Sequence, residues 1–296
     1  MIIFTFLSAA GAALLVWMFA VEPRLREINR YEVSITKKLP RPLRILHLSD
    51  IHFARPDAAL AKFFDRLAAE DFDAVLISGD IMDCKEGLPV CIENLKKLKP
   101  AHGIFAVFGN HDYFDYSFFD VILHNFPGQR EPVSTQPTHL FASEMQAAGI
   151  RVMRNETLEI NAGGAALLIH GLDDPTTGRA NVRKAMQQFE PAKINILLTH
   201  TIDAFLDIGE NEIDLSFSGH SHGGQIRLPF IGALLTHTMM GRAYAGGVML
   251  VKGAVCSISR GVGASRMLWP RLLCRPEAIV LTVKTDDGTG RIRREK

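Results

Sequence analysis

The chain has 296 residues, of which 47% are hydrophobic and 22% are charged, so it can bury a core as one large domain or two modest ones. Its formal net charge of +1 gives no strong field for a nucleic-acid partner, and none is expected. The four cysteines, Cys84, Cys91, Cys256 and Cys274, include no CxxC pair and are too sparse for a disulfide framework. We expect them to be small buried thiols in a reducing compartment.

The N-terminal segment contains no charged side chain before residue 22. A helix of this length rises roughly 31 Å, about the thickness of a bilayer core. Trp17 sits near one end, where an interfacial anchor is common. A signal peptide normally carries basic residues ahead of its apolar run, and this chain has none there. Residues 1–22 are therefore predicted to be a transmembrane anchor, with export through a cleaved N-terminal signal as the alternative.

Residues 23–42 are predicted to be a juxtamembrane linker. From residue 22 to residue 44, seven basic residues outnumber three acidic ones. An excess of lysine and arginine beside an anchor favours the cytoplasmic face of the inner membrane for the globular part. The basic residues either lie against anionic lipid headgroups or belong to an ordinary solvated linker.

Short apolar runs, each of a length that suits a buried strand, follow the linker. They read RILHLSD, DAVLISGD, GIFAVFGNHD, AALLIHGLDD, INILLTH and LSFSGH. Helical spacing over residues 58–70, 88–98 and 182–189 separates several of them, which predicts a layered α/β domain over residues 43–288. Three later runs, GVMLVKG, VCSISRG and AIVLTVK, have no helices between them and are expected to pair into a second sheet. Residues 289–296 are predicted to be a basic, frayed tail.

Polar motifs follow the predicted strands at their C-terminal ends, the edge where open α/β sheets bind ligands. They are SDIH, SGDIMD, GNHD, LLTH and GHSH. Each motif alone fits a turn or a core histidine, but five of them at successive strand ends indicate one shared site. Imidazole, carboxylate and amide groups together suit manganese, iron or zinc. The two GHSH histidines can serve one site only if the backbone turns, which Gly219, Gly223 and Gly224 permit.

The order DxH, GDxxD, GNHD, H, GHxH resembles the signature of the calcineurin-like metallophosphoesterases. The longer GHSHGGQIRLP and SRGVGASRMLWPRLLCRPEAIVLTV resemble the membrane-associated bacterial branch of that family. The resemblance implies a β-sandwich flanked by helices and a site for two divalent ions, manganese first, with iron or zinc as alternatives. It assigns one metal to Asp50, His52 and His222, the other to Asn110, His200 and His220, and a bridging role to Asp80. It also makes His111 the group that protonates the leaving oxygen, oriented by Asp83 or by Asp112.

By the same resemblance the chain is a phosphohydrolase that cleaves a phosphodiester or pyrophosphate bond. Within the branch it resembles the UDP-2,3-diacylglucosamine pyrophosphatases of lipid A synthesis, which release UMP and an acylated sugar phosphate. A general phosphodiesterase or phosphomonoesterase and a non-enzymatic scaffold are the alternatives, and the complete ligand set favours an enzyme. The sequence indicates no obligate protein partner.

The anchor and the apolar stretch at residues 228–250 indicate a phosphorylated, amphiphilic or nucleotide-lipid substrate. That stretch could form a flexible apolar lip, or it could be plain core or a β-hairpin. Core or a hairpin is favoured, because most apolar runs are buried. Arg227, Arg242, Arg260 and Arg266 lie in the predicted loops, and Arg227, Arg260 and Arg266 are the candidates for phosphate contact.

Overall fold

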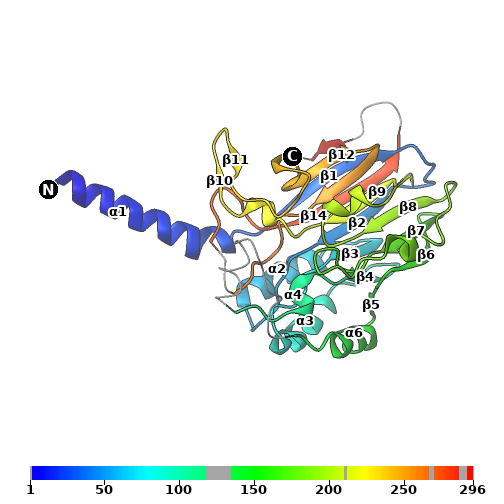
Figure 1. Ribbon diagram of the computed structural model, residues 1–296, viewed down its shortest axis with the longest axis horizontal. Coiled ribbons are helices and arrows are strands. Elements are labelled where there is room, and N and C mark those ends of the chain that lie inside the picture. Colours follow the sequence, from blue (N-terminus) through cyan, green and yellow to red (C-terminus); the bar gives the residue numbers. More distant parts are fainter. Residues whose placement is uncertain (1, 118–134, 210–211, 267–269, 287–291, 296) are drawn as a thin grey trace.

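The structure, a computed structural model, describes residues 2–117, 135–209, 212–266, 270–286 and 292–295. Two β-sheets face each other, helices gather on the outer side of one sheet, and the N-terminal helix projects from one end of the body (Figure 1). The expected α/β sandwich flanked by helices, with one N-terminal apolar helix, is therefore confirmed.

The first sheet has seven described strands in the order β15-β1-β14-β2-β3-β4-β5. Their bounds are Ile292–Arg294, Glu27–Ile35, Glu277–Thr285, Leu43–Leu48, Ala74–Ser78, Ile104–Val107 and Ile150–Val152, in that order. Strands β2 to β5 pair in parallel, so their C-terminal ends share one edge. Every residue of β3 and β4 is buried, as the continuous apolar runs predicted.

The second sheet has six described strands in the order β12-β13-β9-β8-β7-β6. Their bounds are Gly247–Val251, Ala254–Ile258, Leu215–Ser218, Ile194–Leu198, Ala165–Gly171 and Glu156–Ala162. Strands β7, β8 and β9 are also parallel, which brings three more strand ends to one edge. One apolar core fills the space between the sheets, including Ile45, Leu76, Val107, Ile169, Ile196 and Phe217.

Helix α2, Ala58–Ala68, begins where the sequence supplies a cap and a buried stripe. It starts after Asp57, whose carboxylate accepts hydrogen bonds from the backbone N–H groups of Ala59 and Leu60. Its buried face is Leu60, Phe63, Phe64 and Leu67, at the three- and four-residue spacing of a helix. Helices α3 (Leu88–Leu95) and α6 (Thr138–Ala147) pack into the same outer core as α2. The short α7, Val182–Ala185, packs beside the second sheet.

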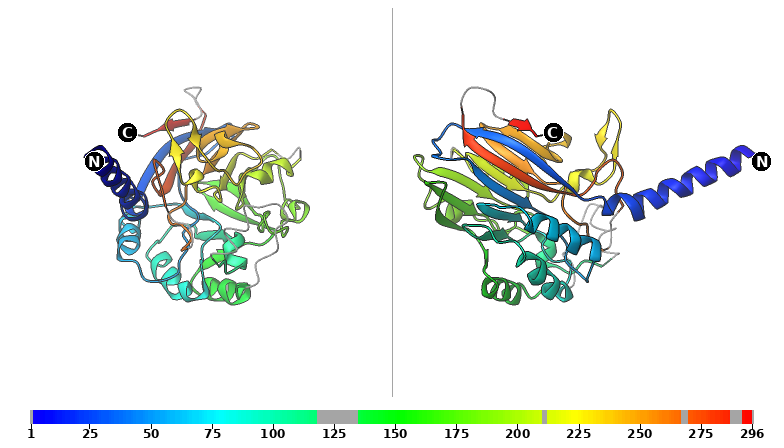
Figure 2. Two further views of the ribbon diagram at one scale, coloured as in Figure 1. Left: turned by 60° about the vertical axis from the view of Figure 1, so that its left-hand side comes forward. Right: turned by 180° about the vertical axis from the view of Figure 1, so that it is seen from behind.

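Helix α1, Ile2–Val16, continues through two further helical turns that end at Arg24. The span Leu7–Arg24 is long and apolar enough to cross a membrane and is almost entirely uncovered by the rest of the chain (Figures 1 and 2). The buried Glu22 fixes the lower end: it accepts a hydrogen bond from Trp17 Nε1 at 2.7 Å and another from the backbone N–H of Cys274 at 2.6 Å.

The predicted linker at residues 23–42 differs from the structure, because Glu27–Ile35 form β1 in parallel with β14. Charged residues such as Arg30 and Glu32 make the strand look like a solvated linker in the sequence. In the structure they form ion pairs with Glu70 and Lys284. Strand β14 was expected in the second sheet but lies between β1 and β2 in the first. The predicted tail also contributes β15, paired with β1, while residues 287–291 and 296 lie outside the described residues.

Candidate metal centre and active site

Polar side chains from both sheets meet where the parallel strands end. Ligand atoms of Asp50, His52, Asp80 and His222 all lie within 4.8 Å of one another. Asp80 belongs equally to a second group with His200 and His220, whose ligand atoms meet the same limit. The strand ends after β2, β3, β8 and β9 therefore supply two adjoining clusters that share one carboxylate.

Asp80 divides its two oxygens between the clusters. Its Oδ2 lies 3.7 Å from His52 Nε2, and its Oδ1 lies 3.5 Å from His200 Nε2. Within the clusters, His52 Nε2 lies 3.3 Å from His222 Nε2, and His200 Nε2 lies 3.0 Å from His220 Nδ1. Ring nitrogens that converge on a shared carboxylate in this way are a donor set that fits two adjacent divalent cations.

Asn110 stands beside the second cluster, at the start of the one-turn helix α4 (Asn110–Tyr113). Its Oδ1 lies 3.2 Å from His200 Nε2, so its amide oxygen is positioned as a further ligand. Every residue that the sequence assigned to the metals is thus brought to one place. The assignment of individual residues to individual metals remains a proposal.

The backbone is strained at this centre. Asp50, His52, Asp80, His220 and His222 all have φ between 47° and 68°, a region that residues other than glycine rarely adopt. Hydrogen bonds hold the strained loops together: His52 N–H donates to the Asp80 carbonyl at 3.0 Å, and His220 N–H donates to both carboxylate oxygens of Asp50. Such clustering of strained residues is typical of functional sites.

Two glycines allow the loops to approach this closely. A Cβ on Gly219 would overlap Ser49 Oγ and Asp50 Oδ2, and a Cβ on Gly109 would overlap Asp80 Oδ1. The expected turn between the two GHSH histidines and the next residues is present, with Gly223 at φ 67° and Gly224 at φ 81°. Gly219 serves a different purpose from the one predicted, since it provides room and not a turn.

The charge states of His220 and His222 suit metal binding. Burial lowers the pKa of His220 and of His222 well below the usual value, so both rings are neutral and offer a lone pair. Burial acts in the same sense on His200, but Asp80 outweighs it and raises the pKa of that ring. His200 Nδ1 lies 2.9 Å from the Ser78 carbonyl, a contact that turns Nε2 towards the cluster.

Asp83, not Asp112, faces His111. Asp83 Oδ1 lies 3.3 Å from His111 Nδ1 and 3.2 Å from His52 Nδ1. Burial opposes its charge, yet His111 and His52 outweigh that effect and lower the pKa of Asp83. Asp112 instead accepts hydrogen bonds from the backbone N–H groups of Ile81, Met82 and Gly109, and burial raises its pKa to about 7.

The family model "Calcineurin-like phosphoesterase" matches residues 43–224 of this chain. The chain belongs to the calcineurin-like phosphoesterase family. Members of this family are hydrolases that bind two divalent metal ions, in agreement with the shared-carboxylate arrangement around Asp80.

Curated relatives extend the similarity over most of the chain. The uncharacterized metallophosphoesterase YkoQ of Bacillus subtilis is 30% identical over 75% of this chain and 78% of its own length. Phosphodiesterase YaeI of Escherichia coli is 27% identical over 90% of this chain and 91% of its own. UDP-2,3-diacylglucosamine pyrophosphatase LpxG of Chlamydia trachomatis is 28% identical over 76% and 78%.

The arginines expected to contact substrate lie in three different settings in this phosphoesterase. Arg260 is held by the buried Glu277 at 2.7 Å, which makes it a structural ion pair. Arg227 donates to the Gly223 carbonyl at 2.9 Å. Of these three arginines, only Arg266 lies beside Asp83, with its Nε 3.6 Å from Asp83 Oδ2.

Arg271 is a residue that sequence reasoning missed. Its side chain is fully buried, and it donates to the carbonyls of Arg260, Gly263 and Cys274. Its Nη2 lies 3.4 Å from His222 Nδ1, so it braces a metal ligand from behind. A single charge inside the apolar run LWPRLLC was the only available signal.

A cavity of about 420 Å³ is lined by several of the candidate metal ligands of the phosphoesterase. Asp80, Asn110, His111, His220 and His222 line its floor, and Ile226, Leu234, Leu235, Tyr116 and His237 are among its walls.

The apolar wall of this cavity belongs to the stretch predicted as core or hairpin. A hairpin is present, formed by β10 (Arg227–Leu228) and β11 (Gly232–Ala233). Its surroundings are not core, since Phe230 is completely exposed and Met239 is 80% exposed. The exposed apolar lip and the hairpin are the same segment.

Proposed function

We propose that this phosphoesterase cleaves a phosphodiester or pyrophosphate bond in an acylated, membrane-associated substrate, with UDP-2,3-diacylglucosamine of lipid A synthesis as the first candidate. The cavity over the ligands carries the proposal, because a polar floor of ligands meets an apolar wall that includes Leu234 and Leu235. Such a cavity matches a molecule with a phosphoryl group on one side and an acyl chain on the other. The similarity to LpxG supports this choice.

The two metal sites would be formed by the residues named above. We assign Asp50, His52 and His222 to one ion, Asn110, His200 and His220 to the other, and Asp80 to both. Manganese is the first choice, with iron or zinc as alternatives. When bound, two such cations neutralise phosphoryl oxygens and lower the pKa of water.

His111 is proposed as the group that protonates the leaving oxygen. It lines the cavity floor, and its Nδ1 faces Asp83, which leaves Nε2 for the substrate. A carboxylate behind the ring fixes its orientation. Tyr116 packs beside it with ring centroids 4.5 Å apart, which limits rotation of the imidazole.

The N-terminal helix is proposed as a membrane anchor with the catalytic domain on the cytoplasmic face. Its apolar span and the basic residues that follow it support this orientation. Export through an N-terminal signal is the alternative and would separate the enzyme from lipid precursors made in the cytoplasm. A C-terminal reporter that is active only in the cytoplasm tests this directly, and an inactive reporter in cells that contain the intact fusion would reject the orientation.

The function is tested with purified full-length protein reconstituted with Mn²⁺. We expect release of UMP from UDP-2,3-diacylglucosamine and loss of that activity in His111→Ala. The exposed Arg183→Gln, on α7, serves as a matched control that leaves the activity unchanged. Cleavage of simple aryl phosphodiesters with the lipid nucleotide left intact would instead support a general phosphodiesterase, the name carried by YaeI. Absence of both bound metal and activity would support a scaffold.

A further inference from the structure

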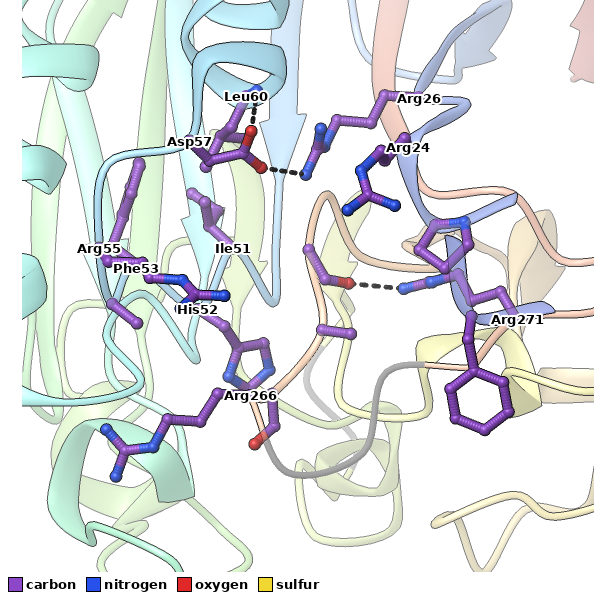
Figure 3. A pocket seen from close by; sticks show the side chains of 16 residues that line it. Arg24, Arg26, Ile51, His52, Phe53, Arg55, Asp57, Leu60, Arg266 and Arg271 are labelled. Carbon is purple, nitrogen blue, oxygen red and sulfur yellow. Dashed lines mark hydrogen bonds and ion pairs between the residues drawn. The ribbon is translucent and has the colours of Figure 1, made fainter. Parts of the chain in front are cut away.

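A second cavity, of about 280 Å³, lies between the end of the N-terminal helix and the metal centre (Figure 3). Phe19 and Pro23 line it from the helix side, and His52 lines it from the metal side. Ser265 lines this cavity and also the cavity over the ligands. The second cavity therefore adjoins both the proposed anchor and the reaction site, and the proposed mechanism assigns it no role.

Positive charge dominates this second cavity. Its arginines are Arg24, Arg26, Arg55, Arg266 and Arg271. Asp57 is the one carboxylate in its lining, and it pairs with Arg26 at 3.2 Å. Arg266 pairs with Asp83 and Asp115. No carboxylate in the described parts of the chain forms an ion pair with Arg24 or Arg55, so two guanidinium charges remain without a paired carboxylate there, while Arg271 donates to three carbonyls.

Arg26 adds a buried donor that has no partner. Its side chain is only 9% exposed. Nε donates to the Val262 carbonyl at 3.0 Å, and Nη2 donates to Asp57 at 3.2 Å. Nη1 is buried and has no hydrogen-bond partner among the described residues. A buried, charged donor left unsatisfied is costly, which points to an acceptor that occupies the cavity.

The geometry suits an anion held from two sides. Arg24 and Arg26 follow α1 and lie across the cavity from Arg55, which belongs to the loop after β2 (Figure 3). Guanidinium groups converging on one space match the oxygens of a phosphate group. Apolar side chains complete the lining, among them Leu60 and the half-exposed Phe19 at the foot of the apolar helix.

We propose that this cavity binds the phosphate group of a membrane lipid, separate from the phosphoryl groups held over the candidate metal ligands. A free phosphate would use the arginines alone, whereas a lipid phosphate also uses the apolar foot of the helix. The inference rests on the proposed membrane anchor and adds a lipid-binding site beside the proposed reaction site.

The test uses inhibition of bis(p-nitrophenyl) phosphate hydrolysis by full-length protein in neutral detergent with Mn²⁺. Dioctanoyl phosphatidic acid is the lipid-phosphate probe, and inorganic phosphate and dioctanoylglycerol supply its two halves separately. We expect Arg55→Gln to raise the inhibition constant of the lipid phosphate about tenfold, and Arg24→Gln/Arg55→Gln about a hundredfold, for loss of one and two charge-assisted contacts. Hydrolysis of the aryl diester should stay unchanged in both variants and in the control Arg183→Gln.

Calorimetric titration with the same probe gives a second measurement that does not depend on turnover. An unchanged affinity of the double variant for dioctanoyl phosphatidic acid would overturn the proposal. If the variants weakened the binding of inorganic phosphate as much as that of the lipid phosphate, the cavity would be a site for a free anion. If dioctanoylglycerol inhibited as strongly as the lipid phosphate, apolar contact alone would explain the binding. Either result would also overturn the proposal. Failure to cleave UDP-2,3-diacylglucosamine would reject the proposed substrate but leave these binding results readable.

Discussion

Replacing Asp83 with asparagine should impair both metal binding and turnover, because one carboxylate oxygen faces two histidines of different function. Asp83 Oδ1 lies 3.2 Å from His52 Nδ1, on a proposed metal ligand, and 3.3 Å from His111 Nδ1, on the proposed proton donor. The contact with His52 is a hydrogen bond, and a hydrogen bond to a charged group contributes about 1.5–3 kcal/mol, which corresponds to roughly 10- to 100-fold in metal affinity. The contact with His111 lacks hydrogen-bond geometry and positions the ring by close approach alone. Partners behind metal-bound histidines show effects of the same size.

The assay separates the two effects. We expect Asp83→Asn to weaken Mn²⁺ binding, measured by competition with a chelating dye, and to lower kcat at saturating metal. His111→Ala should lower kcat and leave metal affinity almost unchanged, since that ring is not a proposed ligand. Asp112→Asn is the matched control: Asp112 accepts only backbone N–H groups, so its loss should lower the free energy of unfolding by about 1–3 kcal/mol. If Asp83→Asn kept wild-type kcat and metal affinity, the positioning role assigned here would be wrong.

Three further predictions follow from buried groups. Burial lowers the pKa of His47 to about 3, so the unfolded chain takes up a proton that the fold does not. The contribution of His47 to the free energy of unfolding is present above about pH 6.5, and the free energy should fall by about 1.4 kcal/mol between pH 7.5 and 5.5. Urea titration of chelator-treated protein should show a smaller fall for His47→Gln than for the wild type. A fall of the same size in both proteins would contradict the prediction. Gly219→Ala should abolish stoichiometric metal binding, because its Cβ would displace Asp50, and full metal content by elemental analysis would refute this. Arg260→Ala should cost about 3 kcal/mol in thermal unfolding but leave KM unchanged, since Glu277 already holds the guanidinium; a raised KM would restore it as a substrate contact.

Much of the site could be predicted from the sequence because its ligands follow short buried strands. Parallel strands end at a common edge, so Asp50 and Asp80 converge in one sheet, and His200 and His220 in the other, once their apolar runs are recognised as strands. The choice between Asp83 and Asp112 could not be made in this way. Asp112 follows His111 directly and Asp83 lies 28 residues before it, yet both carboxylates are buried in the structure, and only the side-chain directions show which one faces His111.

Other features could not be predicted because they depend on residues far apart in the sequence. The charged residues of strand β1 predicted a solvated linker, because their ion-pair partners lie on other elements of the fold. Strand β14 pairs with β1 across more than two hundred residues, and no spacing in the sequence records that pairing. Arg260 resembled a phosphate ligand for the same reason, since its partner Glu277 belongs to β14.

The junction below the apolar helix leaves the chain almost no slack. The helical turns end at Arg24 and β1 begins at Glu27, and Glu22 accepts a hydrogen bond from the backbone N–H of Cys274, which is near the C-terminus. A soluble fragment that starts at the family boundary, residue 43, would lose an inner strand of its sheet and should fold poorly. With α1 in a bilayer, this short connection would hold the catalytic domain close to the membrane surface and in one orientation. Encounters would then be limited to molecules that diffuse laterally within a single leaflet, and the surface density of the substrate, not its bulk concentration, would set the rate.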